Sequence, residues 1–133
     1  MGLIRKTGFH GHIGERVFYP AGSVLAATWN PDRARDLGAG LGRDTRARGF
    51  FTILGPGMDF YRTPFGGRNF QYATGEDPFL ASQLVPEVTK NIQEQGVWAC
   101  AKHFVCNDQE ANRTNINTVI DERTLREIYL PPF

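Results

Sequence analysis

Residues 47–57 read ARGFFTILGPG, and this stretch decides the fold class. The apolar run at 50–54 has the length of a buried strand, and Gly49 before it is a typical helix stop. Upstream, Asn30-Pro31 combines a good N-cap with a proline suited to the first helical position. The stretch and its upstream neighbours therefore predict a helix over residues 31–48 that leads directly into a buried strand.

The same signals recur towards the C-terminus. Asp77-Pro78 repeats the cap-plus-proline start, an apolar stripe at four-residue steps follows, and Gly96 ends the predicted helix. Pro86 lies inside this pattern, so we expect it to kink or split the helix. The next strand is predicted over residues 97–105, and Asp121 is positioned to cap a last helix.

A further apolar run, VLAATW at residues 24–29, predicts a strand before the first helix. The whole order is then β-α-β-α-β-α, which is typical of an α/β fold with parallel strands covered by helices. Roughly three βα units leave the edges of a sheet exposed and do not close a barrel, which needs about eight. We therefore expect the 133 residues to be one part of a larger fold.

Composition narrows the function. Fifteen basic and fourteen acidic residues give a net charge of +1, whereas nucleic-acid binders usually carry a clear basic excess, so no nucleic-acid partner is expected. No apolar run approaches the roughly 18 residues of a membrane helix, so no membrane partner is expected either. Cys100 and Cys106 are favoured as two free thiols over a zinc site or a disulfide. His10 and His12 lack a third partner at a recognisable spacing, so we expect no metal and no other cofactor.

Chemistry is expected in the two long strand-to-helix connections, at about residues 55–76 and 102–120. Functional groups in α/β folds lie beyond the carboxyl ends of the strands, and long irregular loops are usually functional. In the first connection, Arg68 stands between Gly-Gly and Asn, either as a planar cationic donor or as an ordinary solvated arginine. The second opens with Lys102 and His103, a costly pair at the end of a buried strand unless it faces a polar cleft.

Two readings of this second connection stay open. Either the strand simply ends at Lys102, or Lys102 and His103 serve one site and the backbone breaks the usual alternation of strand side chains. Further along, Asp108 and Glu110 resemble an acid/base pair. Nothing in the sequence places them around a shared substrate atom, so surface carboxylates near Arg113 are the preferred interpretation.

Seven short motifs stand in order along nearly the whole chain from about Val17. They are FYPAG (18–22), LAATWN (25–30), GPG (55–57), GRNF (67–70), EDP (76–78), KHF (102–104) and DERTLRE (121–127). Together they resemble the N-terminal domain of family 3 glycoside hydrolases, whose best-known members are bacterial and fungal β-glucosidases. Because the motifs are independent and stand at the right separations, the resemblance is specific.

The resemblance implies that residues 1–133 are a fragment of an N-terminal (β/α)8 TIM-like barrel, a domain usually followed by an α/β sandwich domain. It implies a retaining glycoside hydrolase of the β-glucosidase or β-xylosidase type, which hydrolyses O-glycosyl bonds and releases a terminal non-reducing β-D-sugar from a β-glucoside or oligosaccharide. The nucleophile Asp and the acid/base Glu of the family are expected beyond Phe133. The fragment is therefore expected to contain no catalytic residue and to be inactive without the remainder of the barrel and the C-terminal domain.

The motifs also imply a sugar-binding subsite. By match of motif, the sugar hydroxyls would receive hydrogen bonds from Arg68, Lys102, His103 and Arg113. Non-proline cis peptide bonds are implied around the Lys-His-Phe motif, in agreement with a broken alternation there. Two features depart from the family pattern: Gln71 stands where Glu is commonest, and the stretch 68–76 is one residue longer than usual.

Two alternatives remain beside a β-glycosidase. One is a truncated, non-catalytic sugar-binding protein; the other is a barrel enzyme for sugar phosphates, in which the same cationic side chains hold phosphate. The Gly-Pro-Gly turn lacks the Lys-Ser/Thr ending of a phosphate loop, which weighs against the second alternative. The central expectation is geometric: the cationic side chains of two extended connections gather at a common rim.

Overall fold

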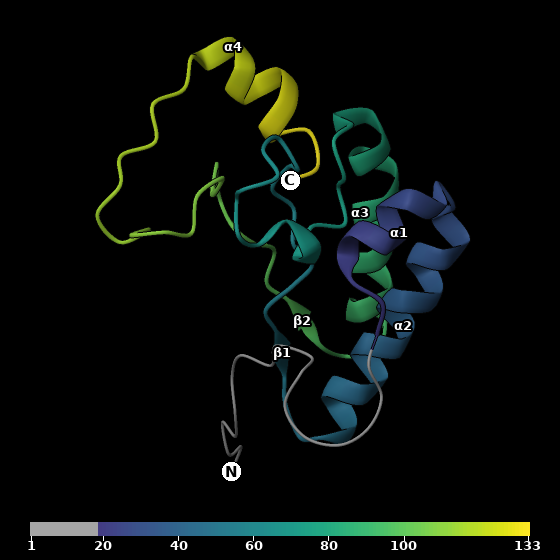
Figure 1. Cartoon of the computed structure of the whole chain (residues 1–133). Helices are drawn as coiled ribbons and strands as arrows, with labels where there is room; N and C mark the ends of the chain where they lie inside the picture. The colour runs from purple at the N-terminus through teal and green to yellow at the C-terminus, as the bar shows by residue number, and fades with distance from the viewer. Residues whose placement is uncertain (1–18) are drawn as a thin grey trace.

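The computed structural model describes residues 19–133. Two long helices lie side by side against a short parallel sheet, and long irregular connections extend from one end of this body (Figure 1). The helices are α2 (Pro31–Ala47) and α3 (Pro78–Gln93). The strands are β1 (Thr52–Ile53) and β2 (Trp98–Ala99), which pair in parallel. The α/β character and the parallel pairing predicted from the sequence are therefore present.

Residues 24–29 belong to a helix, so the predicted first strand is wrong. Helix α1 spans Gly22–Thr28; it buries Leu25 and Ala26 and leaves Val24 half exposed. A short apolar run fits a buried strand and a helix equally well, and the adjacent alanines here favour the helix. Within the described residues the structure thus contains two strands in place of the predicted three, and the expected three βα units are not formed.

The predicted boundaries of the long helices are confirmed. Asn30 and Asp77 each accept a hydrogen bond, through Oδ1, from the backbone N–H two residues on, at 2.8 Å in both cases. Beyond the helix ends, Gly49 and Gly96 have φ values of 77° and 73°, a region that glycine adopts without a steric penalty. The helix α3 runs without interruption through Pro86, so the expected split does not occur.

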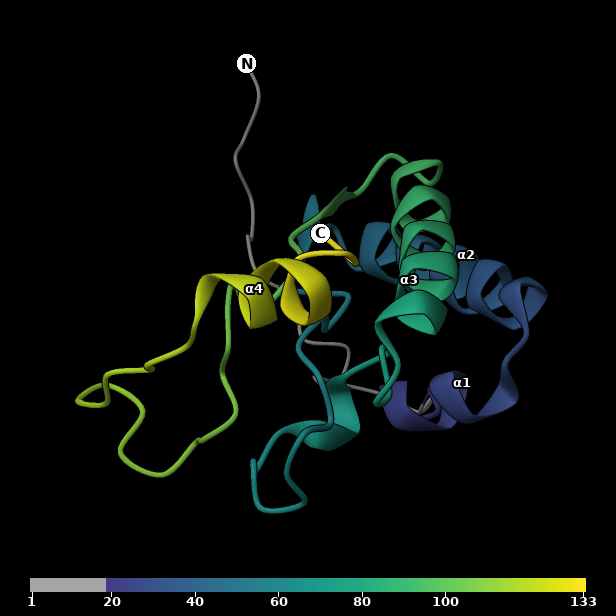
Figure 2. The same cartoon turned by 90° about the horizontal axis from the view of Figure 1, so that it is seen from above.

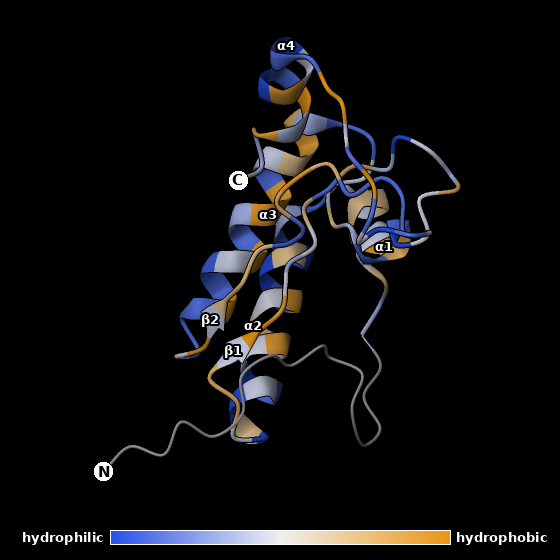
Figure 3. Ribbon diagram, turned by 90° about the vertical axis from the view of Figure 1, so that its left-hand side faces the viewer, coloured by the Kyte–Doolittle hydropathy of each residue, from blue (hydrophilic) through white to orange (hydrophobic). Residues whose placement is uncertain are grey.

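Packing explains how α2 and α3 come so close. A Cβ atom on Gly38 of α2 would collide with the backbone oxygen of Val88 of α3, so only glycine permits this approach. Figure 2 shows the two helices side by side, and Figure 3 shows hydrophobic residues along β1 beside them. The buried side chains between the helices and the sheet include Ala34, Ile53, Leu84, Val85, Val88, Ile92 and Val97.

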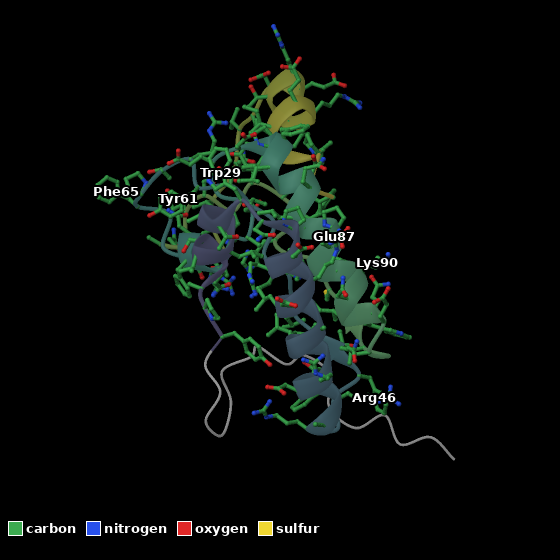
Figure 4. All side chains as sticks on the ribbon, turned by 90° about the vertical axis from the view of Figure 1, so that its right-hand side faces the viewer. Trp29, Arg46, Tyr61, Phe65, Glu87 and Lys90 are labelled. Atoms are coloured by element: carbon green, nitrogen blue, oxygen red, sulfur yellow. The ribbon has the colours of Figure 1, made fainter. Side chains whose placement is uncertain are left out.

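The outer surface of the helical layer is polar. Arg35 Nε of α2 lies 2.8 Å from Glu87 Oε2 of α3, so one surface ion pair spans the two helices. Figure 4 shows Glu87 and Lys90 along α3, with Lys90 turned to solvent. Such exposed pairs contribute little to stability, and the apolar contacts underneath hold the layer together.

Both strands are shorter than predicted, but their pairing continues as an irregular ladder into the connections. The N–H of Lys102 donates to the carbonyl of Pro56 at 3.1 Å. Gly57 forms isolated parallel bridges with both Lys102 and Tyr72. The ladder therefore brings three segments side by side just beyond the carboxyl ends of the strands, which is where function was expected.

The C-terminal helix packs onto the first connection. Helix α4 (Glu122–Thr124) is capped by Asp121, whose Oδ1 accepts from the N–H of Thr124 at 2.8 Å, and it continues as the π-helical turn η2 (Leu125–Tyr129). A short 3-10 turn, η1 (Asn69–Gln71), lies in the first connection. The Tyr129 ring stands edge-on to the Phe60 ring, with centroids 5.8 Å apart. No described helix has both the length and the apolar character needed to cross a membrane.

Candidate functional site

Four predicted side chains gather where the two connections meet. We call Arg68, Lys102, His103 and Arg113 the cationic rim. Arg68 Nη1 of the first connection lies 3.3 Å from His103 Nε2 of the second. Arg113 joins the group through Glu110, whose Oε1 lies 2.7 Å from Arg68 Nη2 and 3.2 Å from Arg113 Nε. The expected gathering is therefore present, and the binding of a sugar by these residues stays a prediction.

The backbone turns sharply at the corner that carries the rim. The Lys102-His103 and Phe104-Val105 peptide bonds are cis, at the place where the resemblance implied them. The Gly55-Pro56 bond in the neighbouring connection is cis as well. Strand β2 ends at Ala99, so Lys102 and His103 do not stand in a regular strand. Their closeness to Arg68 favours the alternative in which both serve one site.

A buried carboxylate binds the backbone of the segment that carries Lys102 and His103. Asp59 has no exposed surface; its Oδ1 accepts from the backbone N–H of Cys106 at 3.0 Å, and its Oδ2 accepts from the backbone N–H of His103 at 3.3 Å. Burial raises the pKa of Asp59 to about 6, although the backbone N–H donors, Asn107 included, oppose this rise. The sequence patterns do not single out Asp59; its only signal is an acidic residue between the apolar Met58 and Phe60.

The imidazole of His103 is neutral at neutral pH. Burial and the charges of Lys102 and Arg68 lower the pKa of His103 to about 4. A guanidinium only donates, so the Nε2 atom that faces Arg68 is an acceptor and the ring proton sits on Nδ1. Nδ1 lies 3.3 Å from the hydroxyl of Tyr72, which itself donates to the backbone oxygen of Asn107 at 3.2 Å. The neutral imidazole therefore orients Arg68 by accepting from its guanidinium.

Lys102 has no partner for its charge among residues 19–133. In the part of the chain that the structure describes, no hydrogen bond or ion pair reaches its ammonium group. Burial lowers the pKa of Lys102, and the nearby charges of Arg68 and Arg113 lower it further. A partly buried, unpartnered cation beside two others is unfavourable unless a ligand supplies acceptors. The N–H donors of the Lys102 ammonium are therefore available to water or to a ligand.

The two carboxylates of the second connection do not form an acid/base pair. Asp108 accepts a hydrogen bond from the hydroxyl of Tyr129, whereas Glu110 is bound by two arginines. The preferred interpretation, carboxylates near Arg113, holds for Glu110. It is incomplete, because Glu110 also pairs with Arg68, which lies 42 positions earlier in the chain.

The described residues were expected to include no metal-binding cluster, and the remaining candidates are two histidines and two cysteines. Residues 19–133 hold no group of three or more His, Cys, Asp or Glu side chains placed to bind a metal ion. Cys100 and Cys106 are both free thiols, the first exposed and the second buried. His10 and His12, considered above as ligands, lie outside the described residues.

The sequence of this chain matches a known protein family and several curated proteins. Residues 5–133 match the family described as the glycosyl hydrolase family 3 N terminal domain. Thermostable beta-glucosidase B of Acetivibrio thermocellus is 44% identical over 86% of this chain, and beta-glucosidase B of Emericella nidulans is 47% identical over 97% of it. In both, the match covers 15% of the relative, so the chain spans about 15% of the length of these curated relatives.

Solved structures of beta-glucosidases also superpose on this chain. DesR, a beta-glucosidase from Streptomyces venezuelae determined in complex with D-glucose, superposes with a TM-score of 0.81 at 42% identity, over 85% of this chain and 14% of that one. Beta-glucosidase 3B from Thermotoga neapolitana in complex with glucose superposes with a TM-score of 0.80 at 41% identity, over 91% and 17%. The resemblance drawn from the motifs is confirmed. The chain belongs to glycosyl hydrolase family 3, to whose N-terminal domain it corresponds.

Proposed function

We propose that this chain supplies part of the sugar-binding subsite of a retaining β-glycosidase of the β-glucosidase type, which releases a terminal non-reducing β-D-sugar. Family membership and relatives named beta-glucosidases support the reaction class. The observation that carries the subsite is the convergence of three cations and one neutral imidazole, with Lys102 lacking any partner among the described residues.

The carboxylate of Glu110 weighs against a sugar phosphate as the ligand of the rim. Arg68 and Arg113 already share the carboxylate of Glu110, whose negative charge would repel a phosphate at the same place. Their remaining N–H groups and the Lys102 ammonium are donors for hydroxyl oxygens, whereas the single lone pair of His103 Nε2 already accepts from Arg68. Such a set of donors suits the oxygens of sugar hydroxyl groups.

We place residues 1–133 within an N-terminal (β/α)8 barrel, with the nucleophile Asp, the acid/base Glu and the C-terminal domain outside them. Parallel strands are normally covered on both faces, yet the side chains of Trp98 and Phe51 are 77% and 54% exposed. A largely apolar cavity of about 220 Å³ lies between α1, α2 and β1. Of the rim residues, Lys102 alone borders it. Both features suit a sheet that further strands would complete.

The test uses the complete open reading frame that contains these residues. The full protein should release p-nitrophenol from p-nitrophenyl β-D-glucoside with retention of configuration, and residues 1–133 alone should not. Glucose should inhibit competitively and inorganic phosphate should not. Hydrolysis with inversion, or competitive inhibition by phosphate without inhibition by glucose, would contradict the proposal.

A further inference from the structure

Glu110 occupies an unusual place for a residue of an irregular loop. Its Oε1 is shared by two guanidinium groups, 2.7 Å from Arg68 Nη2 and 3.2 Å from Arg113 Nε, and its Oε2 accepts from Asn107 Nδ2 at 3.4 Å. The side chain is 28% exposed and that of Arg68 is 23% exposed. Glu110 therefore links the two strand-to-helix connections through a partly buried network of hydrogen bonds and ion pairs.

The backbone around Arg68 is fitted to the same side chain. Gly67 has a φ of 86°, and a Cβ atom at this position would lie 2.9 Å from Glu110 Cβ. The glycine allows the turn before Arg68 to lie directly against the stem of Glu110. Contact with Glu110 thus fixes both the guanidinium and the turn that carries it.

Within the part of the chain that the structure describes, removal of Glu110 would leave Arg68 and Arg113 without a carboxylate bound to them. Arg68, Arg113 and Lys102 carry like charges at short range, and Glu110 is the carboxylate that the structure places between the two arginines. Burial opposes ionisation of Glu110, but hydrogen bonds from Asn107 and Arg68 and the charges of both arginines lower its pKa overall. The carboxylate is consequently ionised at neutral pH and holds no proton to donate.

We propose that Glu110 is a positioning residue for the sugar subsite, an inference that rests on the proposed function of the rim. It holds Arg68 and Arg113 at one separation, so that both guanidinium groups donate to the same bound sugar. Both of its oxygens are taken by protein donors, so Glu110 takes no part in proton transfer. Its effect reaches the sugar only through the two arginines.

The experiment compares Glu110→Gln with a matched control in the full-length protein. Glu127→Gln is the control, because Glu127 pairs with an arginine at 3.0 Å on the exposed surface of the C-terminal helix. We expect Glu110→Gln to raise the KM for p-nitrophenyl β-D-glucoside and the inhibition constant for glucose by about 10- to 100-fold. The pH profile of kcat should keep both limbs, and the control should match the parent protein.

Three outcomes would overturn the proposal. Loss of one limb of the kcat profile in Glu110→Gln would make Glu110 an acid or base. An unchanged inhibition constant for glucose in Glu110→Gln would show that Glu110 forms only ordinary surface ion pairs. A similar loss of affinity in Glu127→Gln would show a general effect of charge.

A second readout separates this inference from the proposed function. The Nε–H NMR resonances of Arg68 and Arg113 report whether each guanidinium is held, with or without a sugar. Loss of their ordered signals in Glu110→Gln supports positioning by Glu110, and unchanged signals overturn it. Failure of the parent protein to bind glucose or to hydrolyse the glucoside would instead contradict the proposed function alone.

Discussion

The helical layer of α2 and α3 and the cationic rim are built in opposite ways. In the layer, side chains such as Leu84 and Ile92 are fully buried in a hydrophobic cluster. In the rim, Arg68 and His103 are held by directional hydrogen bonds and charges, with Asp59 bound to the backbone beneath them. Apolar packing depends on volume, whereas a polar network depends on each partner being present. Stability and ligand binding should therefore respond to different mutations.

The largest expected effect lies in the helical layer. Leu84→Ala removes a fully buried side chain from α3 and leaves a cavity, so the free energy of unfolding should fall by about 2–5 kcal/mol. Glucose affinity of the folded protein should stay at the parent value. Denaturant titration measures the first quantity and calorimetry the second. The control is Val119→Ala, at a side chain that is 87% exposed, and an equal loss of stability there would contradict the account.

Asp59 is the position where the two regions meet, because it is buried like the layer but holds the rim through hydrogen bonds. In Asp59→Asn, one oxygen that accepts from the backbone N–H groups of His103 and Cys106 becomes an amide donor. One buried N–H then loses its partner, at a cost of about 1–3 kcal/mol in unfolding free energy. Glucose affinity should fall as well, because the Lys-His corner moves.

An exposed aspartate provides the comparison for this variant. Asp36→Asn changes a side chain that is 69% exposed and paired with Arg33, and it should alter neither stability nor affinity measurably. Thermal unfolding and glucose titration of the two variants check the difference. If Asp59→Asn lost stability yet bound glucose as tightly as the parent, its support of the rim would be disproved.

The smallest expected effect is the pH dependence of stability near the rim. Burial raises the pKa of Asp59 from 3.8 to about 6, so between these values the folded state binds more protons and this contribution falls as pH rises. Burial lowers the pKa of His103 from 6.5 to about 4, so there the unfolded state binds more protons and this contribution rises with pH. The two slopes oppose each other between about pH 4 and 6.

Removing one group at a time should expose the slope of the other. In His103→Gln, unfolding free energy should fall from pH 4 to pH 6; in Asp59→Asn, it should rise from pH 4 to pH 6.5. Denaturant titrations across this range measure both slopes. Identical slopes in the parent and both variants would show that neither group is perturbed as described.

Local sequence signals predicted the helical layer well. Asn30, Asp77, Gly49 and Gly96 act on backbone atoms within a few residues of themselves, so their roles can be read from neighbouring residues. The strand prediction for residues 24–29 was wrong because a short apolar run fits a helix and a strand equally well. Which of the two forms depends on what the segment packs against. That information is not local.

The candidate site was predictable in its cations but not in its carboxylates. Arg68, Lys102, His103 and Arg113 stand in short motifs whose resemblance to a family assigns them to one subsite. Asp59 and Glu110 act across long separations: Asp59 binds the backbone of the second connection, and Glu110 reaches back to Arg68. Such pairings depend on how the connections fold together, so spacing in the sequence does not reveal them.

The most direct test of the central claim is glucose binding by a Lys102→Met variant of the full-length protein. Methionine keeps the length of the side chain and removes a partly buried charge that has no partner in residues 19–133. The account predicts an unfolding free energy equal to or above that of the parent, together with a loss of about 10- to 100-fold in glucose affinity. Destabilisation with glucose affinity unchanged would contradict it.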